Sequence, residues 1–168
     1  MLKHGFDMHR VFLSAPGDLA AERETCRAAI AQVNESEAMP AKILLVPVGL
    51  VHDGHIVDYR AAVADNVRAS AYFIQIFDDD WGPKNLFRKM FHLALDCRAD
   101  PACPMREVVV FLKAAPRETA PEILAFRQEL AERQDVPVFG FDTAEGLKEQ
   151  LAVVCGAWVR AIVSGPRP

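Results

Sequence analysis

The sequence has few cysteines, no excess of positive charge and no long apolar run. Its four cysteines form no CxxC pair and no histidine stands at zinc-finger spacing, so a structural zinc site is not expected. A Cys97–Cys103 disulfide would close a short loop but is disfavoured in a reducing compartment. The net charge of −4 provides no basic field to attract nucleic acid or anionic lipid.

Two further absences concern membranes and export. The longest apolar run, residues 43–51, contains a proline and a glycine and is far shorter than the roughly 20 residues needed to cross a bilayer. The first ten residues carry five charged or histidine side chains and lack the apolar segment of a signal peptide. We therefore expect a cytoplasmic protein with no nucleic acid or membrane as partner.

The sequence does contain short apolar runs that alternate with segments of helical periodicity. Strands are predicted at residues 11–13, 43–48, 71–77, 108–112 and 136–141. After each run, apolar residues recur every three or four positions, which predicts a helix. No repeat or linker interrupts the pattern, so residues 1–168 are one domain. Strands that alternate with helices and are apolar on both faces predict a parallel, doubly wound α/β sheet.

Ligands of such sheets bind beyond the carboxyl ends of the strands, which directs attention to the turn at residues 14–18. A helix follows this turn, and the N-terminus of a helix can hold an anion. Gly17 would let a ligand approach the backbone. Alternatively, Ser14 or Asp18 simply caps the helix. The turn matches neither GxGxxG nor a P-loop.

The turn after the third predicted strand carries Asp78, Asp79, Asp80 and Trp81. Clustered carboxylates can orient ribose hydroxyls, bind Mg²⁺ or act as acid and base, and Trp81 offers a flat wall for a base or sugar. A solvated acidic turn, with the indole packed over the sheet edge, explains the same residues equally well.

Other polar groups near the same edge have ordinary explanations. Residues 52–55, His-Asp-Gly-His, contain metal-ligand types but also read as a polar turn. Glu22, Arg23 and Glu24 are expected on a solvated helix face with local ion pairs. Arg60 and Lys113 point toward this edge, where either is a surface charge or neutralises a phosphate. No metal site is predicted.

The N-terminal string RVFLSAPGDLAAER, residues 10–23, resembles a bacterial family of TIR-like domains that often precede NACHT-type NTPases. In that family a V-F-[VIL]-S-S strand leads to D-[LV]-x-x-E-R, which Asp18, Leu19, Glu22 and Arg23 match. Residues 69–77 and the later Trp81-Gly82 resemble its second hallmark. The resemblance implies a flavodoxin-like fold, a three-layer arrangement with five parallel strands ordered 2-1-3-4-5, related to TIR domains and nucleoside deoxyribosyltransferases.

In those relatives a pocket at the strand ends binds NAD or a nucleoside, and a Glu in the helix after the third strand faces the ribosyl carbon. This chain has no acidic residue in that helix before Asp96 and has Arg88 and Lys89 instead. The predicted function is therefore a non-catalytic module that binds a nucleotide-like or phosphorylated ligand, or a partner effector protein, in bacterial signalling or defence. The alternative is an N-glycoside-cleaving enzyme, a NAD glycohydrolase or deoxyribosyltransferase-like protein, in which Asp78 and Asp80 replace the Glu.

The predicted pocket lies where the turn after the first strand meets the turn after the third. Its candidate ligand-binding residues are Ser14, Gly17, Asp18, Asp78, Asp80 and Trp81, with Arg88 at the rim for a phosphate. The last predicted helix shows Trp158, Val159, Ile162 and Val163 together, more apolar surface than one packing stripe needs. This surplus predicts a homodimer that uses helices at one edge of the sheet.

Overall fold

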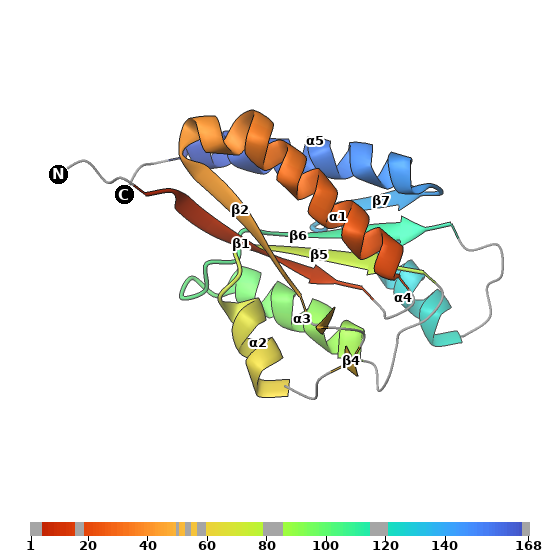
Figure 1. The fold of residues 1–168 in the computed structure, drawn as a ribbon. Helices are drawn as coiled ribbons and strands as arrows, with labels where there is room; N and C mark the ends of the chain where they lie inside the picture. The colour runs from red at the N-terminus through yellow and green to blue at the C-terminus, as the bar shows by residue number, and fades with distance from the viewer. Residues whose placement is uncertain are drawn as a thin grey trace.

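Five parallel strands form one sheet in the order β2-β1-β5-β6-β7 (Figure 1). The computed structural model describes residues 5–15, 19–49, 51–52, 55–56, 60–78, 86–114 and 121–165. The sheet strands are β1 (Asp7–Ser14), β2 (Ile43–Gly49), β5 (Tyr72–Phe77), β6 (Glu107–Lys113) and β7 (Val138–Phe141). Because β3 and β4 form a separate two-stranded hairpin, this order confirms the predicted 2-1-3-4-5 sheet.

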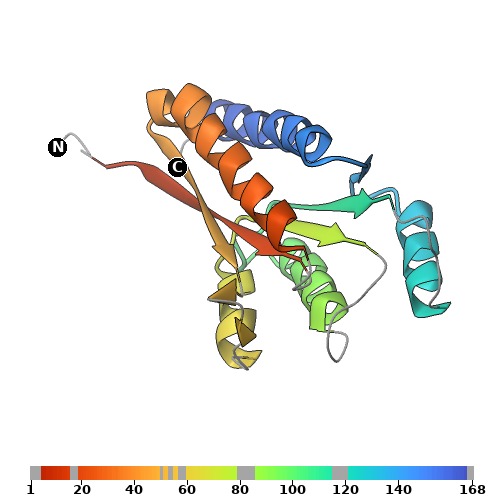
Figure 2. The same cartoon turned by 45° about the vertical axis from the view of Figure 1, so that its right-hand side comes forward.

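Helices cover both faces of this sheet and complete a three-layer α/β architecture (Figures 1 and 2). One face is covered by α1 (Ala20–Val33) and α5 (Ala144–Ser164), which pack on each other as well as on the strands. The other is covered by α2 (Arg60–Arg68), α3 (Leu86–Ala99) and α4 (Pro121–Glu132). Within the described residues, no helix has the length and apolar character needed to cross a membrane.

The side chains of β5 alternate between the two faces of the sheet, so this one strand contributes to both hydrophobic cores. All six of its residues are buried. Tyr72 and Ile74 face the α1–α5 core, whereas Phe73 and Phe77 face the α2–α3–α4 core. The exception is Gln75, a fully buried amide on the second face. An apolar side chain would fill this position without a desolvation cost, so the amide calls for a specific partner.

The structure differs from the sequence prediction in several local elements. Val51–His52 and His55–Ile56 pair as the antiparallel hairpin β3-β4, where the sequence indicated a polar turn at residues 52–55. After α1 the chain continues as a π-helical segment η1 (Asn34–Ala38) and a 3₁₀ turn η2 (Met39–Ala41). The Asn34 side chain holds both backbone groups of Leu45, with Nδ2···O at 2.8 Å and N···Oδ1 at 2.9 Å. This irregular turn thereby docks onto edge strand β2.

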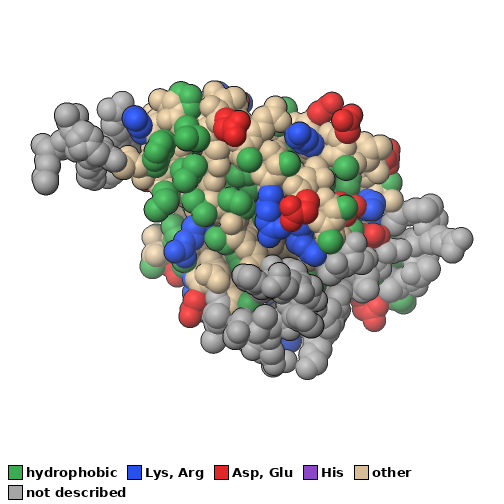
Figure 3. All heavy atoms as spheres, in the orientation of Figure 1, with side chains coloured by type: hydrophobic (Ala, Val, Ile, Leu, Met, Phe, Trp, Pro, Cys, Tyr) green, Lys and Arg blue, Asp and Glu red, His purple; other side chains and the backbone are tan. Residues whose placement is uncertain are grey.

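The four apolar residues predicted together on the last helix divide into two groups: Val163 is 51% exposed and Ile162 is partly buried, whereas the other two lie inside the protein. Trp158 and Val159 are 3% and 2% exposed. The indole stacks on Tyr72 with ring centroids 4.2 Å apart, and its Nε1 donates to Glu107 Oε2 at 2.8 Å. β5 and β6 therefore cover Trp158, so the exposed apolar surface of this helix is smaller than the sequence indicated, and the homodimer stays a prediction. On the face in Figure 3, hydrophobic side chains instead gather toward the end where α1 runs into η1, where Met39 is exposed.

Candidate ligand site at the carboxyl edge of the sheet

Buried polar side chains concentrate where β1, β5 and β6 end. Among the described residues, the buried polar or charged ones are His9, Ser14, Glu22, Arg23, Ser70 and Gln75. Four of these six lie at or next to the carboxyl edge, between the strand ends and the first turns of α1. Burying such groups is unfavourable unless each is hydrogen-bonded or paired, so the partners of each one define what this edge is built to hold.

Ser14 and Gln75 form a closed pair between the last residue of β1 and the neighbouring strand β5. The Ser14 hydroxyl donates to Gln75 Oε1 at 2.8 Å, and Gln75 Nε2 donates to the Ser14 carbonyl at 3.0 Å and to the Ile76 carbonyl at 2.9 Å. Both amide hydrogens of Gln75 are thus used inside the protein. Ser14 therefore does not cap α1; its side chain fixes the end of β1 against β5.

Glu22 and Arg23 turn inward from the start of α1, which contradicts their predicted place on a solvated face. Glu22 Oε1 accepts from Lys113 Nζ at 2.6 Å, a bond that ties α1 to the last residue of β6. Arg23 Nη1 donates to the Ala15 carbonyl at 3.3 Å, at the exit of β1. The first turns of α1 overhang the strand ends, so these two positions face the sheet. Lys113, considered above as a phosphate partner, is instead paired with a carboxylate.

Arg127, which sequence reasoning missed, ties α4 to the same edge. Its Nη2 donates to the Asp78 carbonyl at 2.9 Å and approaches the Lys113 carbonyl at 3.5 Å. Its guanidinium carbon also lies 5.8 Å from the centroid of the Phe77 ring, within the range of a cation–π contact. The available signal was its position next to the apolar stripe of α4, where Ile123 and Phe126 are buried.

The structure describes only some of the remaining predicted site residues. Asp78 follows β5 at this edge and is half-buried, with its carbonyl held by Arg127. Arg88 is exposed and lies against α4, where Nη2 is 3.9 Å from Glu129 Oε2. Gly17, Asp18, Asp79, Asp80 and Trp81 lie outside the described residues. The structure thus brings the ends of β1 and β5 together as expected and turns Arg88 toward the neighbouring helix.

The N-terminus of α1 faces this edge without a cap from the residue that precedes it. That residue is Leu19, which makes no side-chain hydrogen bond to the helix. The first N–H groups of a helix have no partner within the helix and carry a partial positive charge. Glu22 is the acidic residue of the first turn, and its charge is matched by Lys113. In the described part of the chain, no group of three His, Cys, Asp or Glu side chains is arranged to hold a metal ion.

Comparison with known proteins gives a structural likeness. No family model matches the chain, and a search of curated proteins finds no match. Among solved structures, the chain is similar to the metal-soaked Flv1 flavodiiron core from Synechocystis sp. PCC6803, with a TM-score of 0.51 and 14% sequence identity. The fold is flavodoxin-like. The alignment covers 95% of this chain and 37% of the flavodiiron core, and at this identity it shows the fold alone.

Proposed function

We propose that this protein is a non-catalytic binding module whose ligand, nucleotide-like or phosphorylated, sits at the carboxyl edge between the ends of β1 and β5. The resemblance of residues 10–23 to TIR-like domains suggests a place in bacterial signalling or defence, with a separate effector protein as a partner. Parallel α/β sheets bind ligands at this edge, where neighbouring strands send their helices to opposite faces. Here α1 and α3 leave β1 and β5 to opposite faces of the sheet.

The observation that carries the proposal is the network of buried polar side chains under this edge. Three internal ties fix the strand ends: Ser14 to Gln75, Glu22 to Lys113, and Arg127 to the carbonyl of Asp78. Apolar residues of similar size would stabilise a fold at least as well as a buried ion pair. The polar side chains at this edge are explained if the ends of β1, β5 and β6 must be rigid, because a preorganised edge lowers the cost of binding.

The electrostatics of the edge favour an anionic group on the ligand. The start of α1 presents backbone N–H groups, and Leu19 provides no side chain to cap them. Lys113 balances the Glu22 charge in this turn, so that carboxylate does not cancel the attraction of the helix terminus for a phosphate.

The structure gives no support to a glycosidase nucleophile on α3. Within the described helix Leu86–Ala99, the acidic side chain is Asp96, which is exposed and near the helix C-terminus, away from the carboxyl ends of the strands. The enzymatic alternative therefore depends on Asp78 and Asp80 alone. An oxocarbenium-like transition state needs a carboxylate facing the ribosyl carbon, so base release is the outcome that would establish this alternative.

The proposal is tested by thermal unfolding of the full chain with NAD, AMP, ribose 5-phosphate and adenosine, each also followed for base release. A ligand at one hundred times its Kd stabilises the native state by about 2.7 kcal/mol. For a domain of this size, that corresponds to a rise in Tm of roughly 5–11 °C. Asp80→Ala and Trp81→Ala should reduce the rise without lowering the Tm of the free protein, whereas Asp96→Ala serves as the control. No rise with any compound would refute ligand binding of this class, and turnover would identify an enzyme.

A further inference from the structure

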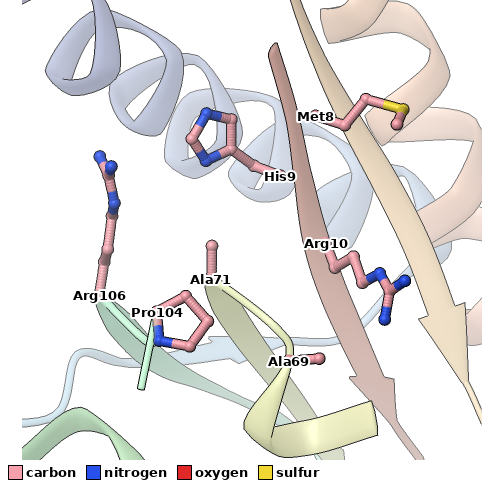
Figure 4. Close-up of a pocket in the computed structure, with 7 residues that line it drawn as sticks. All are labelled: Met8, His9, Arg10, Ala69, Ala71, Pro104 and Arg106. Atoms are coloured by element: carbon pink, nitrogen blue, oxygen red, sulfur yellow. The ribbon is translucent and has the colours of Figure 1, made fainter. Parts of the chain in front are cut away.

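A second polar hollow lies at the opposite edge of the sheet, where β1, β5 and β6 begin. It has a volume of about 440 Å³ and is lined by Met8, His9, Arg10, Ala69, Ala71, Pro104 and Arg106 (Figure 4). Small-molecule sites typically measure about 300–1,000 Å³, so the hollow is large enough for a small organic compound. The network described above lies at the other ends of these strands, so the two features are separate.

His9 is the buried polar residue of this hollow. It is 9% exposed, and its Nε2 lies 3.0 Å from Asp7 Oδ2. This contact fixes the ring and leaves Nδ1 for a second partner. In Figure 4, His9 and Arg106 extend on either side of Ala71, whereas Met8 and Arg10 extend from the opposite side of β1. The imidazole and the Arg106 guanidinium therefore flank the same space.

The two guanidinium groups that border the hollow carry positive charge without a matching carboxylate. Among the residues that the structure describes, neither Arg10 nor Arg106 has an ion-pair partner. Of the neighbouring carboxylates, Asp7 contacts His9 beside the hollow and Glu107 accepts from the Trp158 indole. Burial raises the pKa of the Tyr72 phenol, and the positive charge of the Arg106 side chain opposes that shift. A guanidinium has five N–H donors in a planar fork, so Arg106 keeps donors for a ligand.

We propose that this hollow binds a small organic oxyanion, a phosphate or carboxylate group on a compact apolar body. Arg106 would hold two oxygens of the head group, because a guanidinium fits such groups in a bidentate manner. His9 would contact the head group from the other side of Ala71, and Arg10 would add to the positive potential. The apolar part of the ligand would lie against Ala71 and Pro104. An inorganic ion satisfies the charges but leaves most of the volume empty.

The test is NMR titration of the full chain with phenyl phosphate, benzoate, inorganic phosphate and neutral benzamide. Phenyl phosphate or benzoate should cause saturable shifts of the amides of His9, Arg10 and Ala71; comparison of the two identifies the preferred head group. Inorganic phosphate should bind more weakly, and benzamide should cause no saturable shift. Loss of bidentate hydrogen bonds to a charged group should make Arg106→Gln bind at least about tenfold more weakly. Arg27→Gln removes one charge from an exposed ion pair on α1 and should leave the affinity unchanged.

Several results would overturn the inference. These are equal shifts with benzamide and benzoate, equal losses in Arg106→Gln and Arg27→Gln, or no saturable shift at these amides. Arg106 is exposed, so its substitution is not expected to prevent folding, and the spectrum of the free variant verifies this. Because the two sites lie at opposite edges, shifts restricted to Ser14 and Gln75 would count against this site and not against the proposed function. Binding at this hollow, with no response of the carboxyl-edge amides to nucleotides, would count against the proposed function and not against this site.

Discussion

Replacing Gln75 with leucine tests whether the buried amide holds β1 against β5. The substitution keeps the approximate shape of the side chain and removes three hydrogen bonds, one accepted from Ser14 Oγ and two donated to the carbonyls of Ser14 and Ile76. Each neutral hydrogen bond contributes about 1 kcal/mol net, and the added apolar burial returns about 1 kcal/mol. We expect Gln75→Leu to lower the free energy of unfolding by about 2 kcal/mol, or the Tm by roughly 4–8 °C.

A double-mutant cycle separates this pair from general packing. Ser14→Ala alone should cost about 1–2 kcal/mol, because it leaves the buried Gln75 Oε1 without a donor. Once Gln75 is leucine, the Ser14 hydroxyl has already lost its partner, so the double variant should be nearly as stable as Gln75→Leu. The expected coupling is about 1 kcal/mol, measured by urea unfolding with unchanged m-values. Additive losses, or a Gln75→Leu variant as stable as the natural protein, would refute the assignment of the amide to this role.

Three other predictions concern the Glu22–Lys113 ion pair, the two buried cysteines and the oligomeric state. Glu22→Gln should destabilise the protein by about 1–3 kcal/mol in urea unfolding, because it removes the charge that Lys113 pairs with in a partly buried place; an unchanged free energy of unfolding would contradict the pairing. Burial raises the pKa of Cys155 to about 12 and raises that of Cys26 as well. Both thiols should therefore resist Ellman's reagent at pH 8 until the chain unfolds. Fast labelling of either in the native state would show that its helix, α1 for Cys26 or α5 for Cys155, is not packed on the sheet. Light scattering across the micromolar range tests the homodimer expected from the sequence, and a monomeric mass throughout would remove it.

The fold was predictable because its signals are local and repeated. Continuous apolar runs such as Val108 to Phe111 need cover on both faces, and the right-handed crossover rule leaves few ways to connect them. The hairpin at Val51–His52 and His55–Ile56 was missed because Ile56 also fits the spacing of the helix that follows. The cap of α5 is also local: Thr143 Oγ1 accepts from the Gly146 N–H.

The sequence predicted which strand ends lie side by side better than it predicted the side chains that hold them. Topology placed the ends of β1 and β5 next to each other, which requires no knowledge of side-chain contacts. The direction of Glu22 and Arg23 depends on how far α1 overhangs the strand ends, and helical periodicity carries no such information. Arg127 reaches the edge from a helix that starts far along the chain. Gln75 offered a usable signal, since it is the single amide in the apolar strand YFIQIF.

Mapping AMP binding on the backbone amides of the full chain tests whether a ligand site lies between the ends of β1 and β5. We expect saturable NMR shifts at Ser14 and Ala15, at the first turn of α1, and from Gln75 to Asp78, with no release of adenine. Gln75→Leu should weaken this response, because it removes the hydrogen bonds that hold the ends of β1 and β5 together. Saturating AMP that leaves these amides unmoved, or that shifts only residues at the amino edge, would contradict the account.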